Sequence, residues 1–513
     1  MHRHCVADSR NARDLAILMA LTAMTRWAFR SHFLYDIDSV NFALALGRFD
    51  PRVYQPHPPG YFLYVRLGML AHSIFHDPNT ALIAISILAS CGAVAMIHVL
   101  ASIWFGRAAA AFAAMIFVCS PLAWFYGTVA LTYIVEAFFS ALIGYLCWRV
   151  YCGAARFVFP AAALLGVAAG FRQSSLLVLT PLLMYAMGSV SPKRAWGKRA
   201  WAGISILLLT LAAWSIPMVY QSGGLQAYAS SLWSLWRLVP ARQTVFTSSI
   251  FSSVARFCLI LAIFGLSLGS AALLVFRGSK APSPNGAKTF TWIWISPGLL
   301  LFTFVYLKFV NSGYLLVLLP PACVWVGSWA ADWYQRSSLT SIGRTALLAG
   351  AAAANILIFV RAPMYFSYRE VRRSQQELTA VIAALQQIAQ PQRTLIVGFD
   401  SHFLGYRHAG FYLPRYRTVQ FPEVPLASGA GVFTMKDRQT TLVSHLSLDS
   451  FRDFIVFPLP SSGMEYGEYM KCFRARFAAE GLGVTTLNGI EFVRGPLSAL
   501  PSLFPHLTFE PAP

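Results

Sequence analysis

The chain has 513 residues, of which 57% are hydrophobic and only 12% are charged, with a mean hydropathy of +0.56. Soluble domains carry about a quarter charged residues, so this composition excludes an ordinary soluble protein and indicates a polytopic membrane protein. The net charge of +20 comes from basic residues that stand between apolar segments. This distribution is typical of cytoplasmic loops that face anionic lipid headgroups, and it argues against nucleic-acid binding.

The first apolar segment, residues 14–31, predicts an uncleaved signal anchor, because basic residues precede it and no small-residue cleavage site follows it. Further apolar segments are long enough to cross a bilayer. Together they predict a mainly α-helical membrane bundle of about eleven spans: 14–31, 79–105, 107–121, 131–151, 157–171, 173–189, 200–220, 250–276, 290–307, 313–332 and 342–360.

Residues 61–76 are helical in pattern but short for a span, and they carry an arginine and two histidines. If they crossed the membrane, the basic residues in 193–199 and 277–288 would lie outside, against the positive-inside rule. We therefore predict an interfacial helix on the outer surface, within a first external loop over 32–78. Apolar residues at helical spacing predict another interfacial helix in the outer loop 221–249.

After Ser367 the composition changes to that of a soluble domain. Residues 371–388 have the pattern of an amphipathic helix, and residues 394–398 that of a short buried strand. The sequence thus predicts a transmembrane domain over 1–361 and a small α/β domain outside the membrane over 362–513. Further strands are expected in 449–459 and 483–493.

The first external loop holds two carboxylates, Asp36 and Asp38, directly after the first span, where a charge is costly to desolvate. One interpretation is that they cap a helix beginning near Ser39. The other is chemical, either as a general base or as oxygen ligands of a divalent cation. His57 precedes Pro58-Pro59-Gly60-Tyr61, and the two prolines fix its position ahead of the next helix.

These motifs, in their order along the chain, resemble the C-type membrane glycosyltransferases, which include the protein O-mannosyltransferases and the aminoarabinose transferases of lipid A. The likeness covers roughly residues 10–360, and the HPPGY form at 57–61 is most similar to a bacterial branch of this superfamily. The other matching pieces are Thr132-Tyr133 with Glu136-Ala137, Ala169-Gly170-Phe171-Arg172-Gln173-Ser174, and Asn311-Ser312-Gly313-Tyr314 with Leu318-Leu319-Pro320.

The resemblance implies an inverting transferase that moves a sugar from a polyprenyl-phosphate carrier to an acceptor outside the bacterial inner membrane. Asp38 matches the catalytic aspartate, because Asp38-Ser39-Val40-Asn41-Phe42 fits the usual continuation. Asp36 is a second catalytic candidate, although relatives often have adjacent acidic residues where this chain has Asp-Ile-Asp. No cofactor is assigned, and a divalent cation on Asp36 or His57 stays open.

Such a transfer requires a base for the acceptor hydroxyl and positive charge near the departing phosphate. Arg172 and Lys308, each in a short outer turn, are the candidate phosphate ligands, and snorkelling to headgroups is the alternative for both. His57, Tyr61 and Tyr314 complete the predicted substrate-binding set. Glu136 is expected to pair locally, and a polar cluster in the tail is expected to be a solvated loop: Asp400, His402, Arg407 and His408.

A transporter or flippase of a lipid-linked or anionic solute is the alternative function. Transporters place broken or ionisable helices at the bilayer midplane in repeated halves. Here the charges stand at helix ends, and the sequence shows no repeat. A membrane-anchored assembly factor that uses the tail is a third interpretation, supported only by the presence of that domain.

Overall fold

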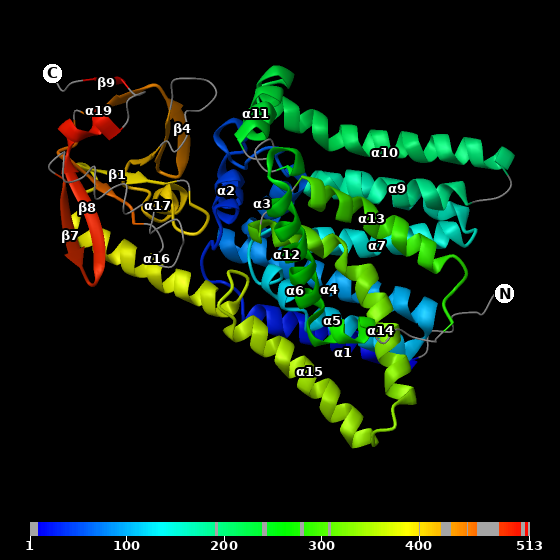
Figure 1. Cartoon of the computed structure of the whole chain (residues 1–513). Coiled ribbons are helices and arrows are strands. Elements are labelled where there is room, and N and C mark those ends of the chain that lie inside the picture. Colours follow the sequence, from blue (N-terminus) through cyan, green and yellow to red (C-terminus); the bar gives the residue numbers. More distant parts are fainter. Residues whose placement is uncertain are drawn as a thin grey trace. The chain divides into compact units, whose positions relative to one another are not determined.

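The computed structural model describes residues 9–189, 193–238, 244–276, 282–305, 309–399, 401–421, 432–448, 450–458, 482–503 and 508–510. The chain forms two compact units. The first contains Met1–Arg30, Tyr61–Tyr220 and Leu235–Glu370, and the second contains Ser31–Gly60, Gln221–Ser234 and Val371–Pro513. Figure 1 labels the elements along the chain.

The first unit is a bundle of helices, and each predicted span overlaps an α-helix over at least part of its length. Its helices are α1 (Ser9–Ala28), α3 (Phe62–Phe75), α4 (Pro78–Phe105), α5 (Arg107–Val118), α6 (Pro121–Tyr126), α7 (Tyr133–Tyr151), α8 (Val158–Phe171), α9 (Ser174–Gly188), α10 (Lys193–Gln221), α12 (Ile250–Leu268), α13 (Ala287–Phe304), α14 (Leu319–Arg336) and α15 (Ser341–Arg361). Among the described residues, five stretches are long and apolar enough to cross a bilayer by themselves: Pro78–Phe105, Tyr133–Tyr151, Gly197–Gln221, Ile250–Leu273 and Ser341–Arg361.

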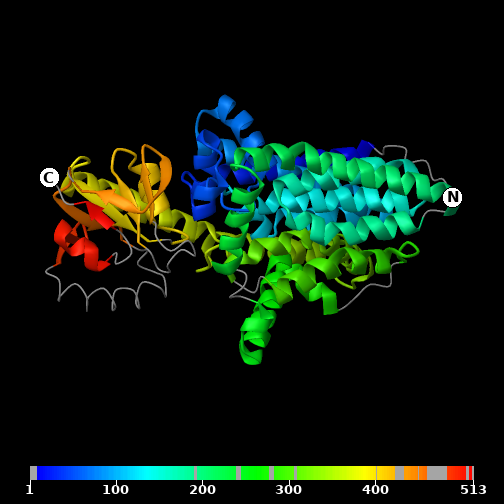
Figure 2. The same ribbon diagram turned by 90° about the horizontal axis from the view of Figure 1, so that it is seen from above.

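Small residues let the central helices approach closely. Figure 2 shows the helices of this bundle from above. A Cβ at Gly327 of α14 would lie 2.6 Å from the Cα of Ala113 on α5, so only glycine permits this contact. On α7, Gly144 lies under the Trp294 ring of α13, whose Nε1 donates to Ser140 Oγ at 3.0 Å. The Ser140 hydroxyl in turn donates to Val317 O at 2.6 Å and fixes the 3₁₀ segment η6 (Phe309–Val317).

The two predicted interfacial segments both contain helices, α3 and α11 (Leu225–Leu238). Their place at a membrane surface stays a prediction. A third helix, α2 (Ile37–Gly47), lies in the first external loop and begins two residues earlier than the predicted start near Ser39. The cause is local: Asp36, rather than Asp38 or Ser39, caps it.

The C-terminal part of the second unit is built on a mixed seven-stranded sheet of order β4-β3-β2-β1-β6-β8-β7. The central strand β1 (Thr394–Gly398) runs parallel to β2 (Thr418–Gln420) and β6 (Asp453–Val456), with Ile396 opposite Thr418 and Ile455. The outer strands pair antiparallel. These are β3 (Val432–Lys436), β4 (Gln439–Val443), β7 (Gly483–Leu487) and β8 (Ile490–Pro496), and a separate parallel pair joins β5 (His445–Ser447) to β9 (Thr508–Glu510).

The predicted strand at 394–398 is confirmed residue for residue, and the predicted helix at 371–388 lies within α16 (Tyr368–Ile388). A short helix, α17 (Tyr406–Tyr412), packs closely on the sheet. A Cβ at Gly398 would lie 2.6 Å from the Cα of Tyr406, so the glycine in β1 makes room for it. The close approach of Gly398 and Tyr406 places α17 directly against β1. The fold class is confirmed, and the domain boundary at 361/362 stays a prediction.

Candidate active site

Asp36 is the N-cap of α2. Its backbone is extended, with φ −104° and ψ 154°, and its carboxylate accepts a hydrogen bond from Asp38 N at 2.8 Å. The capping interpretation therefore applies to Asp36. Asp38 lies in the first turn, where its charge interacts favourably with the positive end of the helix dipole. The two predicted catalytic carboxylates thus differ in role.

Asp38 is paired with His57. Nδ1 of His57 lies 3.1 Å from Oδ1 of Asp38, and the two side chains are 15% and 31% exposed, respectively. The Phe42 ring packs beside the imidazole, with its centroid at 6.0 Å. One oxygen of Asp38 thus lies against the imidazole, while the Asp38 side chain stays partly exposed.

The carboxylates of Asp36 and Asp38 differ in how far they are buried. Asp36 is only 8% exposed, and this burial, together with the nearby negative charge of Asp38, raises its pKa to about 7. The positive charge of His402 opposes the shift. At neutral pH Asp36 is therefore partly protonated beside the more exposed Asp38. In the part of the chain that the structure describes, no three His, Cys, Asp or Glu side chains gather as a metal site.

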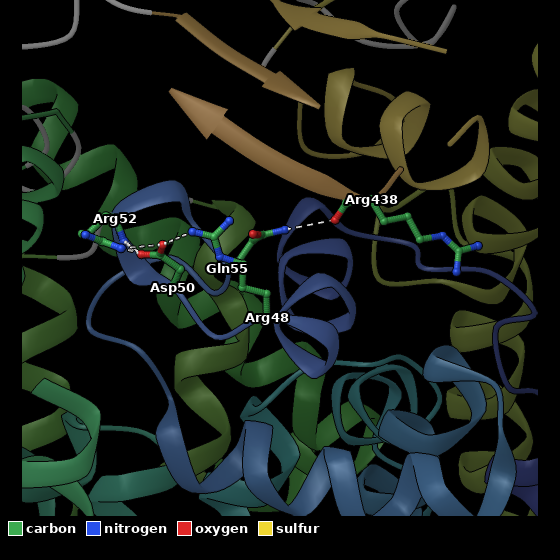
Figure 3. A network of polar contacts seen from close by, with 5 residues as sticks. All are labelled: Arg48, Asp50, Arg52, Gln55 and Arg438. Carbon is green, nitrogen blue, oxygen red and sulfur yellow. Dashed lines mark hydrogen bonds and ion pairs between the residues drawn. The ribbon is translucent and has the colours of Figure 1, made fainter. Parts of the chain in front are cut away.

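The turn that carries His57 is held by a polar network around Asp50, shown in Figure 3. The Asp50 carboxylate binds the guanidinium groups of Arg48 and Arg52 at 3.1 and 2.8 Å. Its backbone N–H donates to Gln55 O at 2.5 Å and closes the turn. Gly60 follows at a φ of 112°, a conformation that favours glycine. The turn therefore presents His57 with a fixed orientation.

Arg172 and Glu136 form a buried ion pair in the first unit. Nε of Arg172 lies 3.0 Å from Oε2 of Glu136, and its Nη1 donates to Thr132 Oγ1 at 2.7 Å. The other oxygen of Glu136 accepts from the hydroxyls of Ser174 and Ser175. Glu136 thus pairs locally as predicted, and Arg172 is not an unpaired surface cation.

Three tyrosines surround this guanidinium. The Arg172 Cζ atom lies 4.0 Å from the ring centroid of Tyr133, 4.2 Å from that of Tyr314 and 5.8 Å from that of Tyr61. Cation–π contacts of this kind stabilise a desolvated cation. The structure therefore brings together three of the predicted binding residues, Tyr61, Arg172 and Tyr314.

Several residues of this cluster were not predicted as site residues. Tyr133 and Thr132 come from the start of α7, one turn before Glu136. This helical spacing, which puts them on the same face as Glu136, was the sequence signal for their place near it. Next to them, the hydroxyl of Tyr126 lies 3.0 Å from that of Tyr365 and 3.4 Å from Ser312 Oγ. Ser312 and Tyr365 also bond to each other. Nothing in the sequence pattern indicated this hydroxyl group, because its members are far apart along the chain.

Two predicted residues, Lys308 and Asp400, lie outside the described residues. The prediction of a solvated loop in the tail is wrong for Arg407 and His408, which are 2% and 0% exposed. Both lie on α17, which packs against the sheet, so their side chains are enclosed. His402 is exposed, as expected for a loop.

No protein-family profile matches the chain, and no curated protein matches it in sequence. Solved structures do match. The crystal structure of ArnT from Cupriavidus metallidurans bound to undecaprenyl phosphate aligns over 95% of this chain and 98% of its own, with a TM-score of 0.58 and 12% identity. The same protein without ligand aligns over 96% and 99%, with the same score and identity. The chain has the C-type membrane glycosyltransferase fold.

This likeness confirms the predicted fold class. Together with the membrane-length apolar helices, it shows a multi-pass integral membrane protein. It also accounts for a mainly helical chain with a mixed sheet near its C-terminus. At 12% identity the likeness shows the fold alone.

Proposed function

We propose that the protein is a glycosyltransferase that moves a sugar from a polyprenyl-phosphate carrier to an acceptor on the extracytoplasmic face of the membrane. The observation that carries the proposal is the pairing of Asp38 with His57 at the start of α2, in a chain with the C-type fold. The ligand of the matching ArnT structure, undecaprenyl phosphate, indicates the carrier class. The donor sugar and the acceptor are left open.

In this proposal the partly exposed carboxylate of Asp38 takes the proton of an acceptor hydroxyl. The acceptor oxygen then forms a bond to the anomeric carbon as the bond from that carbon to the carrier phosphate breaks. The phosphate leaves with the electron pair, and the anomeric configuration inverts. His57 lies against one oxygen of this carboxylate and holds it in place.

The departing phosphate requires positive charge, because charge develops on it as the sugar leaves. We propose Arg172 for this role, with Tyr61 and Tyr314 beside the donor. The ion pair with Glu136 and the bond to Thr132 use Nε and Nη1 of the guanidinium, so Nη2 stays outside these bonds. Lys308 is the second proposed cation.

The test is sugar transfer by the purified full-length chain from a panel of undecaprenyl-phosphate-linked sugars, measured as release of undecaprenyl phosphate. We expect Asp38→Asn to reduce turnover about 10²- to 10⁴-fold, the usual contribution of a general base. Asn is nearly isosteric, so the melting temperature should stay close to that of the wild type.

Asp332→Asn is the matched control, because Asp332 lies on α14, where it pairs with Arg336 four residues along the helix, and it is not among the proposed site residues. Near-normal turnover of Asp38→Asn would reject Asp38 as the base. Movement of the lipid across a vesicle membrane without release of undecaprenyl phosphate would favour a flippase. Repeating the assay with and without a divalent cation decides metal dependence.

A further inference from the structure

We propose that Arg407 is a positioning residue that sets the distance between Asp38 and His57. It acts through residues 34–57, which we call the acidic segment. The inference rests on the proposed function, because it takes sugar transfer as the reaction in which Asp38 and His57 act. All the contacts that carry it lie within the second unit.

Arg407 is a buried cation with neutral partners. Its Nη2 donates to the carbonyl of Val53 at 2.8 Å, and its Nη1 donates to Thr440 Oγ1 at 2.9 Å. The guanidinium also lies over the rings of Tyr406 and Phe433, at 4.9 and 5.7 Å. Desolvating a guanidinium is costly, so these bonds must be well formed for the side chain to stay there. The bond to Val53 joins the C-terminal sheet to the acidic segment.

The acidic segment is tied down around Val53 by further contacts. The side chain of Gln55 donates to Arg438 O at 3.4 Å (Figure 3). The Tyr54 ring packs on Phe433, with centroids 5.6 Å apart. His57 follows only two residues after Gln55. The C-terminal domain therefore holds the turn that presents His57.

The other end of the acidic segment is tied to the same short stretch, residues 402–412. The N–H of Leu34 donates to the Tyr412 hydroxyl at 2.8 Å, and the N–H of Ile37 donates to His402 O, also at 2.8 Å. The second bond satisfies a donor that every helix N-terminus leaves without an intrahelical partner. Because α2 begins at Ile37, this bond sets where Asp38 lies.

Chain neighbours of both Asp38 and His57 are thus bonded to residues 402–412: Ile37 to His402, and Val53 to Arg407. Catalysis is sensitive to such placement, since a misplacement of about 1 Å can cost roughly 10²-fold. Loss of the Val53 bond should free the turn while leaving the sheet folded. The effect should fall on kcat, because the donor site is not changed.

The experiment compares Arg407→Met and Arg407→Lys with the wild type in the full-length protein. Hydrogen exchange of residues 48–57 and tryptic cleavage after Arg48 and Arg52 report on the turn, since both arginines are about half exposed. We expect both signals to rise at least 10-fold in Arg407→Met and less in Arg407→Lys, which keeps the positive charge and one donor nitrogen. Exchange in β1 and β6 should not change.

In the activity assay, kcat should fall about 10- to 100-fold in Arg407→Met with little change in the KM of the donor, and Arg407→Lys should restore part of it. Arg415→Met is the matched control, because Arg415 is an exposed arginine in the same domain. If Arg407→Met does not fold, Tyr412→Phe removes the hydroxyl that holds Leu34 and should loosen residues 34–38 instead.

Unchanged exchange at residues 48–57 in Arg407→Met, or an unchanged kcat, would overturn the inference. A loosened turn in a protein whose wild type transfers no sugar from any carrier would instead reject the proposed function. In that case the tie between Arg407 and the acidic segment would still stand. The two failures are therefore distinguishable.

Discussion

At the scale of single residues, Asp36 and Asp38 show how burial gives two identical carboxyl groups different environments. Asp36 caps α2 and has a pKa of about 7, whereas Asp38 is partly exposed and paired with His57. Pairs of titratable groups in contrasting environments are typical of acid–base sites. The sequence supplied both residues through their motif, but it could not assign the cap, because Asp36, Asp38 and Ser39 are all good capping residues.

The raised pKa of Asp36 predicts a pH dependence of stability. Its folded pKa of about 7 exceeds the unfolded value of 3.8, so its stabilising contribution is complete below pH 3.8 and is lost as the pH rises through about 7. Asp36→Asn keeps a good cap and removes this titration. We expect the melting temperature of the wild type, relative to that of the variant, to fall between pH 5 and pH 8.

His408 acts in the opposite direction, since burial lowers its pKa from 6.5 to about 4, and stability rises with pH across that range. The contribution of His408 is the same in the wild type and in Asp36→Asn, so it cancels when their melting temperatures are subtracted. Thermal unfolding at several pH values is the measurement. A constant difference between the two chains across this range would contradict the assignment of Asp36.

At the scale of elements, η6 is the segment whose placement the tyrosine cluster depends on most. Ser140 holds its end, and Gly313 lies against two aromatic rings. The sequence predicted Tyr314 as a site residue from its motif, and Arg172 from its turn. It could not predict Tyr133 as their neighbour, because that contact depends on how α7 and η6 pack.

Gly313→Ala tests this dependence. The new Cβ would lie 2.4 Å from Cγ of Tyr133 and 2.7 Å from Cζ of Tyr126, so a ring or the segment must move. We expect the affinity for undecaprenyl phosphate to fall about 10-fold, because the rings around Arg172 would no longer fit, and overpacking of about 1–3 kcal/mol should lower the melting temperature. Binding of undecaprenyl phosphate to the purified protein measures the first effect.

Gly350→Ala on α15 is the control, since a Cβ there meets nothing within 4 Å. Alanine favours helix over glycine, so this control should not lose stability. An unchanged affinity in Gly313→Ala, together with an unchanged melting temperature, would mean that the close approach has no consequence for the site.

At the scale of the whole molecule, composition predicted the membrane helices and the C-terminal sheet domain well. Apolar length and periodicity are properties of each segment, so the sequence displays them directly. The grouping of Ser31–Gly60 with Val371–Pro513 is different. It depends on contacts such as that of Arg407 with Val53, which are 354 residues apart in the chain. No local pattern reports such a contact, and the burial of Arg407 was missed for the same reason.

The topology is the remaining prediction at this scale. Cysteines at Gln226 and Asn285, both exposed in the structure, should react differently with a membrane-impermeant maleimide. We expect Gln226→Cys to be labelled in intact cells and Asn285→Cys only after permeabilisation, because the positive-inside rule places the basic loop in the cytoplasm. Among the described residues, Cys152 and Cys258 are exposed thiols; both must first be replaced by serine, together with Cys5 and Cys472, which lie outside the described residues. Labelling in the reverse order would invert the topology.

The attachment of the acidic segment to α17 has a consequence for anyone who recombines this chain with a relative. A chimera joined once, near residue 361, would combine the tail of one parent with an N-terminal loop adapted to the other. Exchanges with crossovers at both borders of Ser31–Gly60, made together with the tail, would instead transfer a matched module.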